Sequence, residues 1–297
     1  MPKGPDLKDF NTLVKHLSGL GYRERRKTLW RRNRPRQPRF LYKFRSFDAS
    51  DSTSVERLRD ILLQSRLRLS SPTEFNDPYD MAVKIVVEGT AVQIRQRLER
   101  LLTVRGMKFA ARQRELNRMM ANQAGVASRA ESSFRETIRA FGVCSFGGDP
   151  RSILMWSHYA RDHRGVCLQF ELARDVRTFA QALPVNYSQD YPILNWVNEA
   201  ESVTSVLLRK YKGWEYEHEQ RITLPDAAGT FIYFRPVALP GMIIGCSASD
   251  ETVERLNDLI RERSLLAFPP LKLYRTYKHD SKYRIIIKKE RTVTNKI

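Results

Sequence analysis

The sequence predicts an α+β domain with a mostly antiparallel sheet and flanking helices, preceded by a basic N-terminal extension. Strand-like and helical stretches are mixed without the strict strand–helix–strand alternation of a parallel α/β fold. Forty-one per cent of the 297 residues are apolar, which is enough for a sizeable core. Positive charge is concentrated at the N-terminus. We therefore expect residues 1–39 to form an extension and linker, and residues 40–297 to form a single domain.

The N-terminal extension carries about half of the net charge of +19, with twelve lysines and arginines against three acids in the first 40 residues. Residues 1–22 have helical spacing of apolar side chains, and Trp30 lies in the basic run that follows. We expect Trp30 to dock on the domain rather than to stack on a base. Such a charged block attracts polyanions, which makes nucleic acid a candidate partner of residues 1–39. A solubilising tail explains the same charge equally well.

The domain is predicted to begin with a strand over "RFLYKFRSF", residues 39–47, where aromatic and basic residues alternate. Because successive side chains of a strand point to opposite faces, Lys43 and Arg45 share one face. The segment "STSVERLRDILLQSRL" then shows a helical apolar stripe, and Thr53 or Ser54 is predicted to cap this helix.

The following segment, "LRLSSPTEFNDPYDMAVKIVV", predicts a short strand, a turn-rich loop and a second strand. The turn is placed at Asn76-Asp77-Pro78, because Asx side chains bond nearby backbone and proline restricts the residue before it. Residues 91–140 are helical in pattern, rich in Arg, Gln and Ala, and poor in apolar residues. They predict a helical insertion, a peripheral hairpin of helices with a solvated outer face.

The second half of the domain mixes further strands and helices. Asp149 is expected to cap a helix that has Pro150 at its first position, and a terminal hairpin is expected to turn at His279-Asp280-Ser281. Strands are predicted over 141–146, 165–172, the end of 201–224, and 231–246, helices over 151–163, the start of 201–224 and 249–263, and the hairpin over 271–289.

The three cysteines, Cys144, Cys167 and Cys246, are odd in number and widely spaced. We expect small buried side chains rather than a disulfide framework or a zinc site, which favours a reducing, cytoplasmic setting. No run of about 18 apolar residues is present, so no membrane-spanning helix is expected. No apolar segment follows the basic N-terminus, so no secretory signal is expected either.

One candidate site lies in the segment "ILMWSHYARDH". Trp156, Tyr159 and His163 have i, i+3 and i+7 spacing and share a helix face, with His158 on the neighbouring face. These rings are expected to line a pocket for a flat ligand, although ordinary half-buried packing explains the aromatic pair as well. The two histidines are five residues apart rather than four, so no metal site is expected.

A second candidate site is "KGWEYEHEQRITL". As a strand it would point Glu215, Glu217, Glu219 and Arg221 to one face, which must meet solvent or a cleft. A carboxylate braced by Arg221 suits stabilising a cationic transition state or binding ribose hydroxyls. A solvated strand edge with ordinary salt bridges is the alternative.

The basic strand and the acidic strand would form one site if they were neighbours in the sheet. Lys43 and Arg45 would then face the acids across the ladder. A cation beside an acid in a cleft is the arrangement that a phosphate-bearing cosubstrate requires, because arginine forks bind phosphate in a bidentate manner.

Four motifs, taken together, carry a resemblance to a known family. The motifs occur in the order "LYKFRSF", "LSSPTEFNDPYD", "CSFGG…ILMWSHYARDHRGVCLQF" and "KGWEYEHEQRI", and the resemblance covers roughly residues 40–290. They resemble the bacterial domain-of-unknown-function 2971 family, which has no agreed activity.

The order of the motifs is also similar to that of ADP-ribosyltransferases, with "LYKFR", then "CSF", then "EHE". The resemblance implies that Arg45 or Lys43 holds the phosphates or ribose of NAD, and that Ser145 supports the nicotinamide ribose. It implies that Glu219, or else Glu217, stabilises the oxocarbenium-like transition state. The chain departs from that family where Lys43 replaces the arginine and where the mid-chain strand has "CSF" in place of Ser-Thr-Ser.

The expected function is transfer of ADP-ribose from NAD, or a related nucleotide-processing reaction, onto a macromolecular target, with nucleic acid preferred and a toxin or phage-defence role suggested by the family's bacterial setting. The alternatives are a non-enzymatic nucleic-acid-binding protein whose aromatic patch stacks bases, and a nuclease if Asp77, Asp80 and Glu219 converge. The enzyme hypothesis requires the segments around Arg45, Tyr159 and Glu219 to meet in one pocket. The expected catalytic residues are Glu219, Glu217 and Arg45, and the expected NAD-binding residues are Lys43, Ser145, Trp156, His158, Tyr159 and Arg221.

Overall fold

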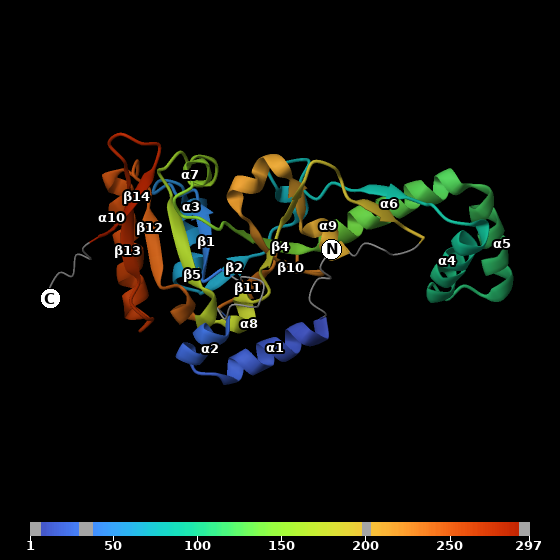
Figure 1. Cartoon of the computed structure of the whole chain (residues 1–297), viewed down its shortest axis with the longest axis horizontal. Helices are drawn as coiled ribbons and strands as arrows, with labels where there is room; N and C mark the ends of the chain where they lie inside the picture. Colours follow the sequence, from blue (N-terminus) through green and yellow to red (C-terminus); the bar gives the residue numbers. More distant parts are fainter. Residues whose placement is uncertain (1–6, 30–37, 198–202, 291–297) are drawn as a thin grey trace.

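The computed structural model describes residues 7–29, 38–197 and 203–290 (Figure 1). A five-stranded sheet lies at one end of the molecule, in the order β1-β5-β12-β13-β14. The β12–β13 pair is parallel and the other pairs are antiparallel. The strands coincide with alternating or wholly apolar runs of the sequence. The wholly apolar run of β12 fits its position, because β12 is buried at every residue. The strands are β1 (Phe40–Arg45), β5 (Val166–Glu171), β12 (Gly241–Ile244), β13 (Lys272–Lys278) and β14 (Ile285–Lys289).

A second, antiparallel sheet has the order β4-β10-β6. It is joined to the first sheet where Tyr42 of β1 and Gly147 exchange backbone hydrogen bonds of 3.1 and 2.7 Å. β4 lies between β1 and β10, so these two strands are not neighbours. The condition under which Lys43 and Arg45 would face the acids across a ladder is therefore not met. The strands are β4 (Gly142–Phe146), β6 (Leu183–Pro184) and β10 (Gln220–Leu224).

Three two-stranded ribbons complete the strand structure. The β2–β11 ribbon is antiparallel, whereas β3–β8 and β7–β9 are parallel. Six of the nine described pairings are thus antiparallel, which confirms the predicted α+β class. The strands are β2 (Arg66–Arg68), β3 (Lys84–Val86), β7 (Asn186–Ser188), β8 (Ile193–Asn195), β9 (Arg209–Tyr211) and β11 (Phe231–Tyr233).

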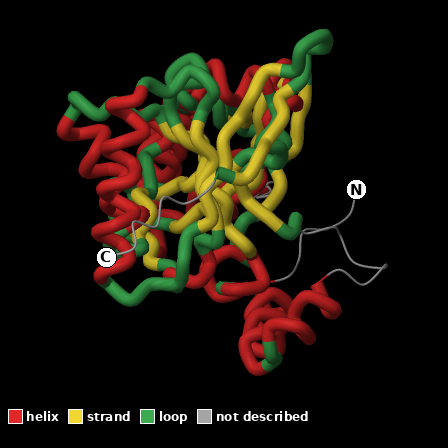
Figure 2. Tube along the Cα trace, turned by 90° about the vertical axis from the view of Figure 1, so that its left-hand side faces the viewer, coloured by secondary structure: helices red, strands yellow, loops and turns green. Residues whose placement is uncertain are grey.

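Helices surround the strands, as Figure 2 shows with strands gathered at the centre. The predicted first helix of the domain is present, but its N-cap is Asp51, whose side chain accepts the Thr53 N–H, rather than Thr53 or Ser54. The terminal hairpin is confirmed, with the predicted turn between β13 and β14. The helices around the sheets are α3 (Ser52–Leu62), α7 (Ile153–Tyr159), α8 (Val176–Phe179), α9 (Val203–Leu207) and α10 (Asp250–Leu265), with 3-10 turns η1 (Pro72–Glu74), η2 (Leu172–Arg174), η3 (Lys212–Glu217) and η4 (Pro236–Ala238).

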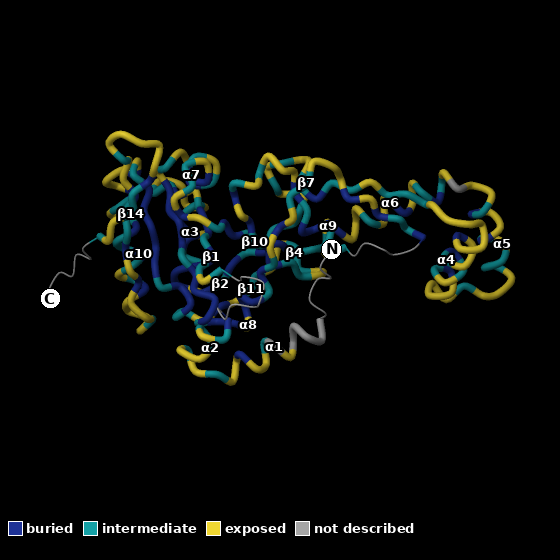
Figure 3. The backbone as a smooth tube through the Cα atoms, viewed as in Figure 1, coloured by how far each residue is buried: buried dark blue, intermediate teal, exposed yellow. Residues whose placement is uncertain are grey.

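The predicted helical insertion forms three helices rather than a hairpin, namely α4 (Ala91–Val104), α5 (Phe109–Ala121) and α6 (Gln123–Ala140). We call residues 91–140 the arm, because α4 and α5 lie far from the sheets in Figure 1. The arm has its own apolar cluster, which includes Leu98 and Leu116. Its outer surface is exposed, as expected (Figure 3).

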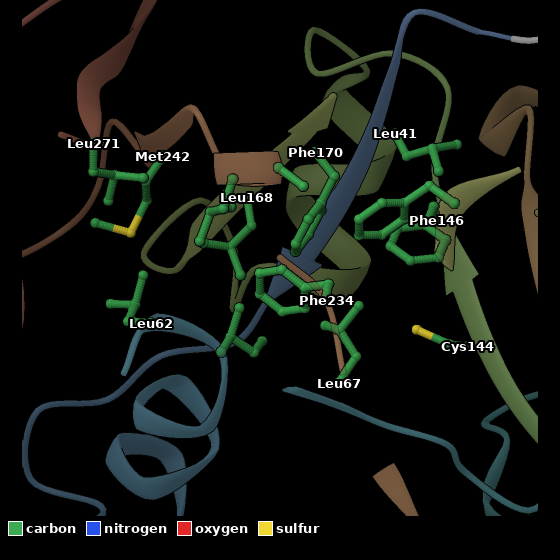
Figure 4. Close-up of a cluster of buried hydrophobic side chains, with 14 of the residues drawn as sticks. Leu41, Leu62, Leu67, Cys144, Phe146, Leu168, Phe170, Phe234, Met242 and Leu271 are labelled. Atoms are coloured by element: carbon green, nitrogen blue, oxygen red, sulfur yellow. The ribbon is translucent and has the colours of Figure 1, made fainter. Parts of the chain in front are cut away.

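The main core lies between the sheets and the helices that cover them. Leu41, Phe146, Phe170 and Phe234 converge there from β1, β4, β5 and the segment after β11 (Figure 4). The rings of Phe146 and Phe170 meet edge to face, with centroids 5.8 Å apart. This core fixes β1 against β4. It thereby also fixes the position of the side chains of β1 and β4 that point away from the core. None of the described helices has the length and apolar character needed to cross a membrane.

The described part of the N-terminal extension packs on the domain. It forms α1 (Leu7–Gly19) and α2 (Tyr22–Leu29), which lie beneath the strands in Figure 2. Leu17 is fully buried in the main core, and the Tyr22 hydroxyl donates to Glu171 at 2.7 Å. These helices are therefore docked rather than free. Trp30 and the arginines around it lie outside the described residues, and nucleic-acid binding by residues 1–39 stays a prediction.

Candidate functional site

A hollow of about 350 Å³ opens where β1, β4 and the start of β10 meet, and we call it the charged hollow. Its volume lies in the range of about 300–1,000 Å³ typical of small-molecule sites. The segments around Arg45, Tyr159 and Glu219, which the enzyme hypothesis requires to converge, all line it. Of the nine residues predicted as site residues, seven line the hollow: Lys43, Arg45, Ser145, His158, Tyr159, Glu217 and Glu219.

The loop "FNDPYD" also lines the charged hollow, through Phe75, Asn76 and Asp80. The sequence predicts a turn in this loop, and the loop has no place in the predicted transferase site. Its turn chemistry is confirmed, because the Asp77 carboxylate accepts the Tyr79 N–H at 2.9 Å. The turn brings Asp80 inward, where its side chain is only 3% exposed.

Five buried ionised side chains form what we call the charge network: Asp80, Lys210, Glu217, Glu219 and Arg221. Arg221 is fully buried and holds Asp80 through two hydrogen bonds of 2.9 and 2.6 Å. It also holds Glu219 through two hydrogen bonds of 2.8 and 3.0 Å. Lys210 donates to Glu217 at 2.6 Å and to Glu219 at 3.2 Å. Three acids face two cations, so the ionised network carries one uncompensated negative charge.

The acidic segment is not the continuous strand that the sequence predicts. Residues 212–217 form the 3-10 turn η3, and His218 then adopts a left-handed conformation with φ of 44°. Glu215 is consequently exposed, whereas Glu217 and Glu219 are buried. Gly148 packs against this turn, and a Cβ there would lie 2.7 Å from that of His218. The predicted strand is therefore interrupted at His218, where the chain packs against the distant Gly148.

Arg221 lies behind Glu219 rather than on the wall of the hollow. The expectation that it faces a cleft with the acids is wrong. Its guanidinium also donates to the Leu207 carbonyl at 2.9 Å, so that its bonds go to protein groups. It is a positioning residue for Glu219.

Burial and charge move the pKa values of the two hollow-facing glutamates in opposite directions. Burial raises the pKa of Glu219, but the charges of Arg221 and Lys210 outweigh it and lower the pKa to about 2. For Glu217, burial together with the negative charge of Glu219 outweighs Lys210 and raises the pKa above the ordinary value of 4.5. Burial and the nearby Glu217 also raise the pKa of Tyr159, whose hydroxyl donates to Glu217 at 2.7 Å.

We expect Glu219 to make the fold acid-sensitive. Its folded-state pKa is lowered from 4.5 to about 2, so its stabilising contribution is present above pH 4.5 and is lost as the pH falls towards 2. The loss has an upper size of about 3 kcal/mol. Urea unfolding of wild type and Glu219→Gln at pH 6 and pH 3 measures it. The unfolding free energy of Glu219→Gln should change less between pH 6 and pH 3 than that of wild type. An equal change in the two proteins would contradict the lowered pKa of Glu219.

The other side of the charged hollow is basic. The Lys43 ammonium donates to the Ser145 carbonyl at 2.9 Å, and burial lowers its pKa. The Arg45 Nε is buried without an acceptor in the described part of the chain, and burial lowers the pKa of Arg45 too. Arg68 is paired with Glu74 at 2.9 Å. A buried guanidinium N–H without an acceptor is costly unless a ligand supplies one, which favours an anion at Arg45.

The aromatic residues of the predicted helix take different positions. Trp156 is fully buried, donates its indole N–H to the Pro150 carbonyl at 2.8 Å and supports the wall of the charged hollow from behind. The prediction that Trp156 faces a ligand is therefore wrong. The helix begins after its cap Ser152, not after Asp149, and ends at Tyr159. His163 is past the helix end and stacks on Trp156, outside the charged hollow.

His158 lies on the exposed rim of the hollow. Its ring meets Trp214 edge to face, with centroids 5.9 Å apart, and lies 6.3 Å from that of Tyr216. This contact packs α7 against η3, the two elements that present Tyr159 and Glu217 to the hollow. His158 therefore belongs to the site by position, as predicted, but contacts protein rings on one side.

Fold and site together define an α+β protein with a small-molecule-sized hollow that is basic on one side and acidic on the other. A family model described as "Protein of unknown function (DUF2971)" matches residues 155–222. The match confirms the resemblance to that family, and it covers α7 from Met155 onward and every member of the charge network except Asp80. No curated protein and no solved structure matches the chain. The resemblance to ADP-ribosyltransferases is not shown by these comparisons.

Proposed function

We propose that the charged hollow binds NAD and that the protein transfers ADP-ribose from it to a macromolecular acceptor. The observation that carries the proposal is that Arg45, which has no carboxylate partner among the described residues, and Glu217, a buried carboxylate of raised pKa, line the same hollow. A dinucleotide has both features that these groups suit, a phosphate chain and a ribose that becomes positively charged.

The basic side of the hollow suits the phosphates. Arg45 has an Nε–H for which no described protein group is the acceptor. Lys43 donates one of its ammonium hydrogens to a backbone carbonyl. Charge-assisted hydrogen bonds to phosphate are about twice as strong as neutral ones, and burial strengthens them further. Ser145, which sits on the same wall, lies near enough to Glu219 to lower the pKa of that residue and is placed to hold a ribose hydroxyl between the two sides.

The acidic side suits the bond that breaks. When the bond between ribose and nicotinamide is cleaved, nicotinamide leaves with the electron pair and the ribose carbon becomes cationic. A lone pair of the acceptor then forms the new bond, and the acceptor proton passes to a carboxylate or to water. A fixed carboxylate beside the cationic carbon stabilises the transition state more than the substrate.

Glu217 fits this role better than Glu219. Both oxygens of Glu219 are held by Arg221, and Lys210 adds a further bond. Glu217 is held by one cation and by the Tyr159 hydroxyl. The uncompensated negative charge of the network is therefore most available at Glu217. Glu219 orients Lys210, which in turn orients Glu217.

The nuclease alternative lacks a supporting arrangement. Asp80 and Glu219 do approach each other, but Arg221 lies between them and bonds to both. Asp77 bonds to the Tyr79 backbone and lines a different hollow. The three carboxylates are used in these contacts rather than directed at a common point.

Nicotinamide release from NAD, with mass spectrometry of labelled acceptors, tests the proposal. We expect Arg45→Ala to raise the KM for NAD by about tenfold or more, because a charged hydrogen bond contributes about 1.5–3 kcal/mol. Arg45→Lys should restore part of the loss, since it keeps the charge without the fork. Arg177→Ala on the exposed face of α8 is the control and should behave as wild type. Wild-type protein that neither binds NAD nor releases nicotinamide would leave the non-enzymatic alternative.

A further inference from the structure

A second hollow, of about 500 Å³, adjoins the charged hollow, and we call it the aromatic hollow. Lys210 lines both hollows. Tyr79, Tyr191 and Tyr211 line the aromatic hollow although these residues are 63%, 50% and 50% exposed. Trp214 completes the lining, with its ring 5.0 Å from the Lys210 ammonium. Four large rings around one opening, three of them largely in solvent, mark a binding surface rather than core packing.

The polar groups of the aromatic hollow indicate what kind of ring would enter. Asp190 and the Asp77 oxygen that does not accept the Tyr79 N–H line the hollow, and carboxylate oxygens accept hydrogen bonds from amino groups on the edge of a base. Arg209 also lines the hollow, and its Nε is buried without an acceptor among the residues described. The two acids offset the two cations that line the hollow, Arg209 and Lys210, so its lining has no net positive charge to attract a phosphate. The rings favour a flat heterocycle. An unpaired nucleobase has both the stacking face and the polar edge that these groups require.

A short ribbon leads from the aromatic hollow to the arm. Pro192 lines the hollow, and β8 begins at the next residue, Ile193, paired with β3. After β8, Trp196 lies under Arg97 of α4, with 5.3 Å from guanidinium to ring. Val197 is buried in the apolar cluster of the arm. Since β8 has three residues at about 3.3 Å each, the hollow and the base of the arm are about 10 Å apart along it.

The arm is basic. Residues 91–140 contain eleven lysines and arginines against four glutamates, a net charge of +7. Arg100, Arg105 and Arg114 are exposed and have no carboxylate within salt-bridge distance in the described ranges. Exposed arginines of this kind attract a polyanion and repel a basic peptide.

We propose that the aromatic hollow takes one unpaired base of a single-stranded nucleic acid whose phosphates run along the arm, and that this strand is the ADP-ribose acceptor. The acceptor assignment rests on the proposed function, whereas binding of the strand does not. A nucleophilic atom of the bound nucleotide forms the bond to ribose as nicotinamide leaves, and its proton passes to water or to Glu217. Lys210, which both hollows share, places the base beside the reacting ribose.

Fluorescence anisotropy with labelled single-stranded DNA and RNA of about 12 nucleotides, within the range of known single-strand site sizes, tests the binding without NAD. We expect Tyr191→Ala/Tyr211→Ala to weaken binding at least tenfold, because each stacked base contributes strongly. Tyr191→Phe/Tyr211→Phe should keep wild-type affinity, since the ring is retained. Tyr283→Ala is the matched control, because Tyr283 is fully exposed on the β13–β14 turn, outside the aromatic hollow. A duplex of the same sequence should bind more weakly than the single strand.

The role of the arm is tested by the triple variant Arg100→Glu/Arg105→Glu/Arg114→Glu. Its affinity for the single strand should depend less steeply on salt concentration than that of wild type. Equal affinity of the alanine double variant and wild type, equal binding of duplex, or preference for a basic peptide would each overturn the inference.

Two readouts separate this inference from the proposed function. Tyrosine-dependent strand binding without nicotinamide release would leave the base site standing and remove the transferase. Nicotinamide release without strand binding would remove only the nucleic-acid acceptor.

Discussion

Glu217→Gln should lower the kcat of nicotinamide release by about 10²–10⁴-fold, the range for removing a group that acts only in the transition state. Gln keeps the size of the side chain and can still accept from Lys210, but it carries no charge to oppose the positive ribose. Binding of NAD should change little, so KM should stay within a few-fold of wild type. Steady-state kinetics on purified protein, with a thermal-unfolding control, measures both parameters.

The fold should tolerate this substitution for an electrostatic reason. The ionised charge network has one excess negative charge, and Glu217 is the member whose pKa is raised by burial and by Glu219. A neutral side chain at this position leaves two acids against two cations. The unfolding free energy of Glu217→Gln should therefore equal or exceed that of wild type at neutral pH.

The control for Glu217→Gln is Glu215→Gln, the same chemical change two residues earlier on the exposed side of η3. It should retain full activity. The raised pKa of Glu217 also predicts that wild-type activity falls, on acidification, at a pH above 4.5. Full activity of Glu217→Gln, or equal losses in the two variants, would move the reacting carboxylate elsewhere.

Much of the architecture follows from local pattern. The strands β1, β4, β5 and β14 coincide with alternating or apolar runs that predict them, because burial on a pleated sheet imposes that pattern. The convergence of the basic strand, the "WSHYA" helix and the acidic segment is also predictable, since each combines core residues with polar residues that a core rejects. These features depend on which residues are apolar and where, and one sequence contains that information.

The charge network depends on information that local pattern lacks. Nothing in the sequence marks Lys210, and Asp80 is marked only as part of the nuclease alternative, while its partner Arg221 lies 141 residues away. The alternation in "WEYEHEQR" predicts a solvated or cleft-facing strand, whereas the structure turns at His218 and buries both Glu217 and Glu219. That burial is possible because Lys210 and Arg221 lie against the two glutamates, since isolated carboxylates cannot be buried. Arg221 is in turn held by Asp80, which is 141 residues away. The one available signal is an excess of acids that a strand face would otherwise expose.

Arg221→Met should be the most destabilising substitution in the charged site, lowering the unfolding free energy by about 3–5 kcal/mol. Arg221 donates two hydrogen bonds each to Asp80 and Glu219, and its own side chain is wholly buried. Methionine fills a similar volume but leaves two buried carboxylates with Lys210 as their remaining cation. Because domains of this kind have an unfolding free energy of about 5–15 kcal/mol in total, the substitution should remove a large part of it.

Urea unfolding distinguishes this loss from a general effect of removing charge. Arg118→Met breaks an exposed pair with Glu115 on the arm and should cost about 0–1 kcal/mol. Asp80→Asn combined with Arg221→Met should recover part of the stability, because one uncompensated carboxylate is removed and the two sites share a contact. A loss at Arg221 no larger than that at Arg118 would mean that the buried acids are neutral in the folded protein. Glu219 would then lose its place as the anchor of Lys210, and Glu217 would lose the support on which the proposed chemistry depends.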